Sequence, residues 1–246
     1  MTIDRFYYEV KLMGMRVILT PILVVLGFCL LALLLTYLKV GPARALLAGV
    51  EMMLPLAAGA VVGMIVAQDP SLELQLTVPR RYHLTGMLRV GLILAWTMCV
   101  SLLDISGIAG LKMLYLPEYM VSWSPVATFF LTQLLWFAPL LFCVGIGFCF
   151  SLLMQSRTAA VALLGGLWVA EIVFKDLIGG SDLLRPFFLF PATLGIYPAT
   201  NATADIYNKY VLTTRYEILG MAVLFLFLGW LLLRRPERML KGVSEE

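Results

Sequence analysis

Charged residues are scarce in this sequence: only 13% of its 246 residues are Asp, Glu, Lys or Arg. Soluble domains are close to half apolar, and about a quarter of their residues are charged. Here 61% of the residues are hydrophobic and the mean hydropathy is +0.95. One soluble core cannot bury that much apolar surface. The composition therefore predicts an integral membrane protein, in which the lipid bilayer solvates the excess.

Motifs for catalysis, nucleotide binding and metal binding are also missing. The sequence contains one histidine, His83, and no H-E-x-x-H, G-x-S-x-G or G-x-x-x-x-G-K-[ST] pattern. The cysteines form no C-x-x-C pair and lie in apolar runs, which favours packing roles; they are Cys29, Cys99, Cys143 and Cys149. We expect no metal, no cofactor and no catalytic residue in this chain, and no nucleic-acid partner.

Six apolar runs have the length, about 20 residues, that a helix needs to cross a bilayer. Ser124–Pro125 is typical of a helix start, and Gly179–Gly180 of a helix end. The predicted spans are residues 17–37, 45–67, 84–103, 125–153, 158–178 and 216–233. The predicted fold is an all-α integral membrane protein, and residues 1–246 form a single transmembrane domain.

The distribution of Lys and Arg near the span ends indicates the orientation, because these residues are enriched on the cytoplasmic side. The arrangement with the N-terminus inside places more of them in the cytoplasm than outside. The strongest indication is the C-terminal cluster of Arg234, Arg235 and Arg238. We expect both termini in the cytoplasm, which requires an even number of spans, and a multi-pass location in the cytoplasmic membrane.

Residues 1–14 are predicted to form an amphipathic helix on the inner membrane surface. The apolar side chains that recur there at helical spacing are Ile3, Phe6, Tyr7 and Val10. A frayed, charged terminus is the alternative. The segment also lacks the short apolar core and cleavage site of a signal peptide, so we expect the first apolar run to be retained as a span.

Two loops are unusual. Residues 69–80, on the inner side, begin with Asp69–Pro70 and contain Pro79 near their end. Apolar and polar residues alternate between these positions, which taken alone favours a strand. A lone strand would leave its backbone groups unpaired, so we predict a short helix. Residues 179–215, on the outer side, hold apolar patches that prolines interrupt. These patches are too short to span, and we expect them to re-enter the outer leaflet, where protein must cover their backbone.

Ionisable residues within the spans are candidates for function, because burying them in lipid is costly. Glu171 is the deepest in its span and Glu51 lies two turns into another. We assign both as candidates for a substrate path; an interhelical hydrogen bond or a water-facing position is the alternative for each. Arg89 and Lys175 lie near span ends, from which they can extend to the headgroups.

The inner loop carries a resemblance to a known family. Its sequence is Ser71-Leu-Glu-Leu-Gln-Leu-Thr-Val-Pro79-Arg80, between two spans, and it resembles the loop between spans two and three of ABC-2 type exporter permeases. In that family the loop forms a coupling helix that docks on a separate ATPase. The resemblance assigns ATPase coupling to Leu72, Glu73, Leu76, Pro79 and Arg80. Pro70–Ser71 departs from the usual Gly-Thr or Gly-Ser at the start of this helix.

The resemblance implies a permease subunit of an ATP-driven exporter that moves a hydrophobic or amphiphilic substrate, such as a lipid, drug or peptide. Its partners would be two ATPase subunits, which would hold ATP and magnesium, a second or sister permease, and membrane lipids. The substrate path would lie between permeases, lined by spans two and five, where Ala57–Ala60 and Gly165–Gly166 permit close helix approach. A permease-like sensor or assembly factor, or a membrane-embedded enzyme, is the alternative.

Overall fold

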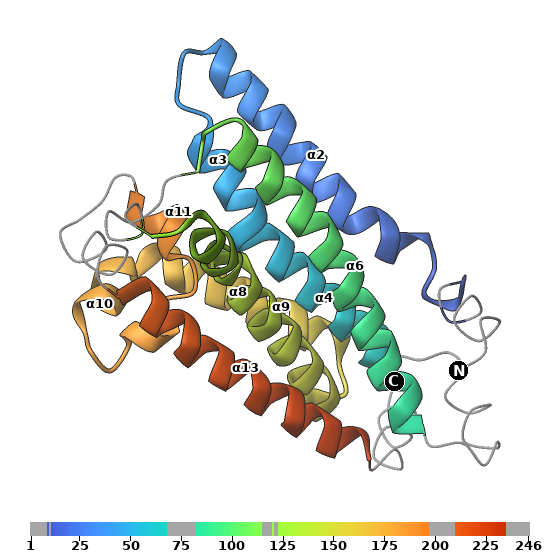
Figure 1. The fold of residues 1–246 in the computed structure, drawn as a ribbon. Helices are drawn as coiled ribbons and strands as arrows, with labels where there is room; N and C mark the ends of the chain where they lie inside the picture. Colours follow the sequence, from blue (N-terminus) through green and yellow to red (C-terminus); the bar gives the residue numbers. More distant parts are fainter. Residues whose placement is uncertain are drawn as a thin grey trace.

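The computed structural model describes Glu9, Met120 and residues 11–67, 82–114, 123–196 and 210–234. All regular structure in these ranges is helical, which confirms the predicted all-α class (Figure 1). The elements are α2 (Met15–Tyr37), α3 (Ala43–Ala48), the π-helix η1 (Gly49–Met53), α4 (Leu54–Ala67), α6 (Tyr82–Gly110), α8 (Pro125–Met154), α9 (Arg157–Val173), α10 (Lys175–Gly180), the 3-10 helix η2 (Arg185–Phe187), α11 (Pro191–Ile196) and α13 (Val211–Leu233).

Five helical stretches in the described ranges are long and apolar enough to cross a membrane: α2, the continuous run α3–η1–α4, α6, α8 and α13. The protein is therefore multi-pass, as the sequence predicts. The structure differs from the prediction at the fifth span, residues 158–178. Its helix α9 has 17 residues and ends at Val173, and the chain bends at Phe174 before the short helix α10. At 1.5 Å per residue α9 is about 25 Å long, which is less than the hydrocarbon core of about 30 Å.

The turn between α8 and α9 follows from its local sequence. Gln155 takes a left-handed conformation with φ of 51° and ends α8. Ser156 then caps α9, because its hydroxyl accepts a hydrogen bond from the Ala159 amide at 3.4 Å. At the other end of α8 the Ser124 hydroxyl accepts from the Ala127 amide at 3.3 Å, which confirms the predicted start. Two residues thus join α8 and α9 in a tight hairpin.

Helix α8 lies at the centre of the bundle, where it packs against α4 and α13. Its backbone touches that of α4: a Cβ atom added at Gly147 would lie 2.2 Å from the Gly59 carbonyl oxygen, and one at Gly59 would lie 2.4 Å from the Cys143 carbonyl oxygen. No side chain other than hydrogen fits at either position. Small residues of this kind allow helices to pack closely in membranes, where there is little hydrophobic drive to bring them together.

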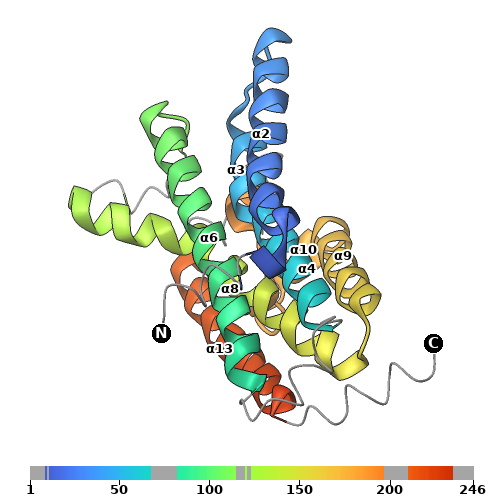
Figure 2. The same cartoon turned by 90° about the vertical axis from the view of Figure 1, so that its right-hand side faces the viewer.

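Helix α2 lies at the periphery and contacts α3, α4 and α6. The C-terminal ends of α2 and α6 project apart from the rest of the bundle (Figure 2). The apolar side chains that α2 exposes lie along its whole length: Leu19, Leu23, Leu26, Leu30, Leu33 and Leu34. We interpret this surface as facing lipid, because a bilayer solvates leucine as well as a protein core does.

Candidate functional site

The segment between α10 and α13 folds back into the bundle. Phe188, Leu189 and Phe190 are almost completely buried, against side chains of α8, α9 and α13. Pro186 is the second residue of η2 and Pro191 the first of α11, so neither ring displaces a helical hydrogen bond. Both short helices lie at the end of the bundle where α13 begins (Figure 1). This is the part of the outer loop that the sequence predicts to re-enter the membrane.

Glu51 holds the start of α11. One carboxylate oxygen accepts a hydrogen bond from the Ala192 amide at 3.0 Å; the other accepts from the Thr193 amide at 2.6 Å and the Thr193 hydroxyl at 2.7 Å. The first amides of a helix have no partner within it, and a carboxylate from another helix satisfies them here. Glu51 therefore caps a helix 141 residues further along the chain.

Arg215, the fifth residue of α13, completes this arrangement. Its guanidinium donates one hydrogen bond to Glu51 and another to the carbonyl oxygen of Leu189. The side chains of Glu51 and Arg215 are 1% and 0% exposed. Ions are expensive to remove from water and need a charged partner and further hydrogen bonds when they are buried. The pair satisfies that need and joins the second span to the last.

Glu171, near the end of α9, also binds the backbone of the segment that Glu51 and Arg215 contact. It accepts a hydrogen bond from the Leu189 amide at 3.2 Å and is 3% exposed. Leu189 therefore donates its N–H to Glu171 and offers its C=O to Arg215. The second carboxylate oxygen of Glu171 has no hydrogen-bond partner among the described residues. Non-helical backbone is tolerated at membrane depth only where protein satisfies it, and these side chains do so.

The π-helix η1 carries Glu51 and has one more residue per turn than the α-helix on either side. Such turns occur mostly as single turns inside α-helices and are frequent at functional sites. Here the wide turn provides two contacts with different neighbours. Glu51 reaches α11 and α13, and the Met52 sulfur accepts a hydrogen bond from the Trp168 indole of α9 at 2.7 Å.

A second buried ion pair lies at the other end of the bundle. The Arg89 guanidinium of α6 donates to the Glu9 carboxylate at 2.8 Å, and both residues are 5% exposed. Arg89 is thus buried and paired, whereas the sequence suggested that it extends to the headgroups. The partner comes from the chain segment before α2. Glu9 and residues 11–14 are the only parts of the predicted interfacial helix that the structure describes.

The sequence-predicted site residues fall into two groups. Glu51 and Glu171 meet at the re-entrant segment, where their bonds to backbone and to Arg215 favour the structural alternative over an open substrate path. The residues assigned to ATPase coupling lie outside the described residues: Leu72, Glu73, Leu76, Pro79 and Arg80.

The small residues expected to bring spans two and five close to a partner permease have different surroundings, and the approach itself stays a prediction. Gly59 is packed inside the chain against α8, while nothing lies within 4 Å of a Cβ atom added at Gly165 or Gly166. Ala57 and Ala60, in the same span as Gly59, line a cavity between α2 and α4 instead.

Sequence reasoning missed Arg215, because it stands one residue before a predicted span and was assigned to the outer side. A signal was present, since Glu51 and Glu171 are buried acids and a basic residue at a neighbouring span end is the simplest partner for them. Among the described residues, no three His, Cys, Asp or Glu side chains gather as a metal site would require.

The five long apolar helices, with a buried irregular segment fixed by charged side chains, define a multi-pass helical membrane protein. The chain matches no protein-family model, no curated protein and no solved structure.

Proposed function

We propose that this chain is the six-span permease subunit of an ATP-driven exporter for a hydrophobic or amphiphilic substrate, working with separate ATPase subunits that bind ATP and magnesium. The observation that carries the proposal is the segment of residues 188–194, which is buried in the bundle, precedes α13 in the chain and is fixed by Glu51, Glu171 and Arg215. A short apolar re-entrant loop before the last span is one of the features that the resemblance to ABC-2 type permeases implies.

The packing of α9 supports six crossings rather than five. At one end of α9 the Ala160 side chain meets Gly63 of α4, and at the other end Glu171 binds the segment that Glu51 also holds. Gly63 lies twelve residues after Glu51, and Ala160 lies eleven before Glu171. Helix α9 therefore runs antiparallel to α4 and covers the same depth. Six crossings place both termini on one side of the membrane, as the distribution of Lys and Arg suggests.

The two ends of α4 have different partners, which suits a transport cycle. Beyond its C-terminal end lies the inner loop, residues 69–80, which we assign to ATPase contact. The other end continues through η1 to Glu51, which is bonded to α11 and α13. A displacement of the inner loop would therefore be passed to α11 and α13 by a rigid helix and a buried ion pair. A permease without its own nucleotide site needs such a link to a partner.

Site-specific photocross-linking tests this proposal. A benzophenone amino acid placed at Leu72 or Leu76, in membranes of the native host, is expected to capture a protein with a P-loop ATPase sequence, identified by mass spectrometry. The matched control is the same probe at Leu183, which is 82% exposed in the outer loop and is expected to capture no ATPase. Capture of no ATP-binding protein from either inner position, with full photoactivation of the probe, would contradict the proposal.

A further inference from the structure

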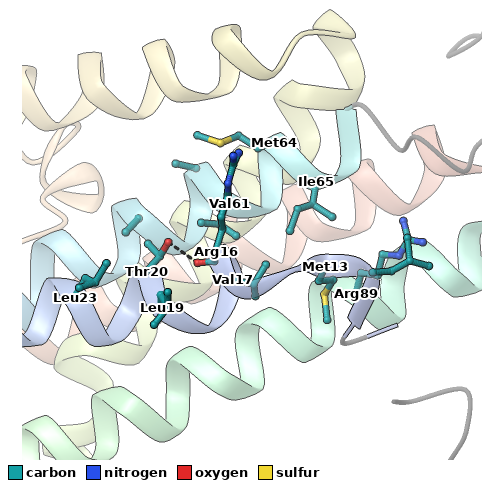
Figure 3. Close-up of a pocket in the computed structure, with 13 residues that line it drawn as sticks. Met13, Arg16, Val17, Leu19, Thr20, Leu23, Val61, Met64, Ile65 and Arg89 are labelled. Carbon is teal, nitrogen blue, oxygen red and sulfur yellow. Dashed lines mark hydrogen bonds between the residues drawn. The ribbon is translucent and has the colours of Figure 1, made fainter. Parts of the chain in front are cut away.

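An elongated cavity of about 650 Å³ lies between α2, α4 and α6. Its walls are mostly apolar and include Val17 and Leu23 of α2 together with Ala57, Val61 and Ile65 of α4. The cavity is partly open and not enclosed within the bundle, and Figure 3 shows the side chains that line it. Its volume falls in the range of roughly 300–1,000 Å³ that is usual for small-molecule sites. The apolar length and open side suit a chain-like ligand that enters from the bilayer.

Arg16 places a positively charged side chain in this mostly apolar cavity. The Arg16 side chain extends from α2 across the cavity, and its guanidinium lies beside Met64 of α4 (Figure 3). Arg89 lies at the end of the cavity beyond Met13 (Figure 3) and is paired with Glu9. Arg16 has no ion-pair partner among the described residues. The cavity therefore combines apolar walls with a positive charge that no acid among the described residues pairs with.

The dimensions match those of a lipid in a single leaflet. The lining extends from Leu12 to Leu23, eleven residues apart, on the α2 side, and from Ala57 to Ile65, eight apart, on α4, so the groove is about 12–16 Å long at 1.5 Å per residue. One leaflet of the hydrocarbon core is about 15 Å thick. Arg16 lies in the first turn of α2, at the edge of the membrane, and Leu23 lies toward its middle. The charge is thus near headgroup depth, and the part of the groove from Arg16 to Leu23 is at acyl-chain depth.

We propose that this cavity binds one anionic phospholipid, with the phosphate on Arg16 and an acyl chain between α2 and α4. A guanidinium forms strong, charge-assisted hydrogen bonds to phosphate, and the apolar walls accommodate the chain. Lipids without net negative charge bring a cation of their own near Arg16 and bind more weakly. The inference concerns a resident lipid and does not depend on the exporter assignment.

Native mass spectrometry of the purified full-length chain tests the inference. After incubation with equal amounts of phosphatidylglycerol and phosphatidylcholine, we expect one phosphatidylglycerol to be retained per chain. Arg16→Gln is expected to lower the retained fraction about tenfold, as loss of a charge-assisted hydrogen bond implies. The matched control is Lys39→Gln, an exposed cation at the opposite end of α2, which should leave retention unchanged.

A second pair of variants tests the acyl groove independently of charge. Ala57→Phe fills the groove and is expected to abolish retention, whereas Ala162→Phe, at an exposed position of α9, is expected to preserve it. Inorganic phosphate distinguishes a headgroup-only site: the inference requires that millimolar phosphate leaves phosphatidylglycerol bound. Equal retention of the two lipids, unchanged retention in Arg16→Gln or Ala57→Phe, or displacement by phosphate alone would each overturn it.

Discussion

Glu51 and Arg215 form a buried ion pair between residues 164 positions apart in the chain. The pair joins the second span to the last, and both residues also bond to the backbone of the re-entrant segment, Glu51 at Ala192 and Arg215 at Leu189. The pair therefore links the second span, the last span and the re-entrant segment by polar contacts, in addition to their apolar packing.

Removing either charge is expected to destabilise the protein strongly. Glu51→Gln removes the carboxylate that forms the ion pair with the buried Arg215 guanidinium, and Arg215→Leu removes the guanidinium that pairs with the buried Glu51 carboxylate. Breaking a buried pair in this way costs about 3–5 kcal/mol. Unfolding in mixed detergent and SDS, followed by circular dichroism, measures the loss. The combined variant Glu51→Gln/Arg215→Leu is expected to lose less than the sum of the two.

The exposed pair between Arg185 and Asp182 serves as the control for this experiment. Its atoms are 2.8 Å apart, but the Asp182 side chain is 94% exposed. Surface pairs contribute about 0–1 kcal/mol, so Asp182→Asn should leave the unfolding midpoint nearly unchanged. Equal losses of stability for Asp182→Asn and Glu51→Gln would contradict the prediction that the buried pair matters more for stability than the exposed one.

The contact between Gly59 and Gly147 predicts that replacing different glycines by alanine has different effects on stability. Gly147→Ala forces α4 and α8 apart, because the added Cβ atom would meet the Gly59 carbonyl oxygen at 2.2 Å. Overpacking of this kind costs about 1–3 kcal/mol. Gly165→Ala, where nothing lies within 4 Å, is expected to be neutral or to stabilise the helix. The same SDS unfolding measurement compares them, and similar losses would contradict the described packing of α4 on α8.

The sequence predicts the apolar elements well, because length and composition determine them locally. The start of α8 at Ser124–Pro125 and the uncharged run of α2 are examples. The early end of α9 was not predicted, since residues 158–178 are apolar enough to read as one helix and the bend at Phe174 leaves no periodic signal.

The ion pair could not be assigned from one sequence either. Glu51 and Glu171 are recognisable as buried acids, but their meeting at Leu189 depends on how three spans and a loop pack together. The π-turn at Gly49–Met53 that directs Glu51 and Met52 to different neighbours is likewise set by tertiary contacts rather than by residue spacing.

The buried position of the re-entrant segment predicts that a cysteine placed in it reacts poorly with a thiol reagent in water. In a variant without native cysteines, Phe190→Cys is expected to resist a membrane-impermeant maleimide, because Phe190 is 0% exposed. Leu183→Cys, at an exposed position seven residues earlier, is expected to react. Mass spectrometry of intact cells treated with the reagent gives the two extents. Rapid labelling of Phe190→Cys would place the segment at the surface instead of within the bundle.

The proposed six crossings predict which side each loop faces. Asn201→Cys, in the loop before α13, is expected to react with the impermeant maleimide in intact cells. Glu245→Cys, at the C-terminus, is expected to react only after lysis. Asn201→Cys that reacts only after lysis, or Glu245→Cys that reacts in intact cells, would contradict six crossings with both termini in the cytoplasm.

Co-purification of an ATPase tests the central claim most directly. The tagged chain, its Glu73→Lys variant and the control Glu245→Lys are expressed equally in the native host, and the P-loop ATPase recovered with each is quantified. A carboxylate at Glu73 offers charge-assisted hydrogen bonds to a basic residue of the ATPase, and reversal of its charge replaces attraction with repulsion. We predict recovery with wild type and Glu245→Lys and at least about tenfold less with Glu73→Lys, the loss expected for a charged contact. Recovery of no ATPase with the wild-type chain, or equal recovery with Glu73→Lys, would contradict the account.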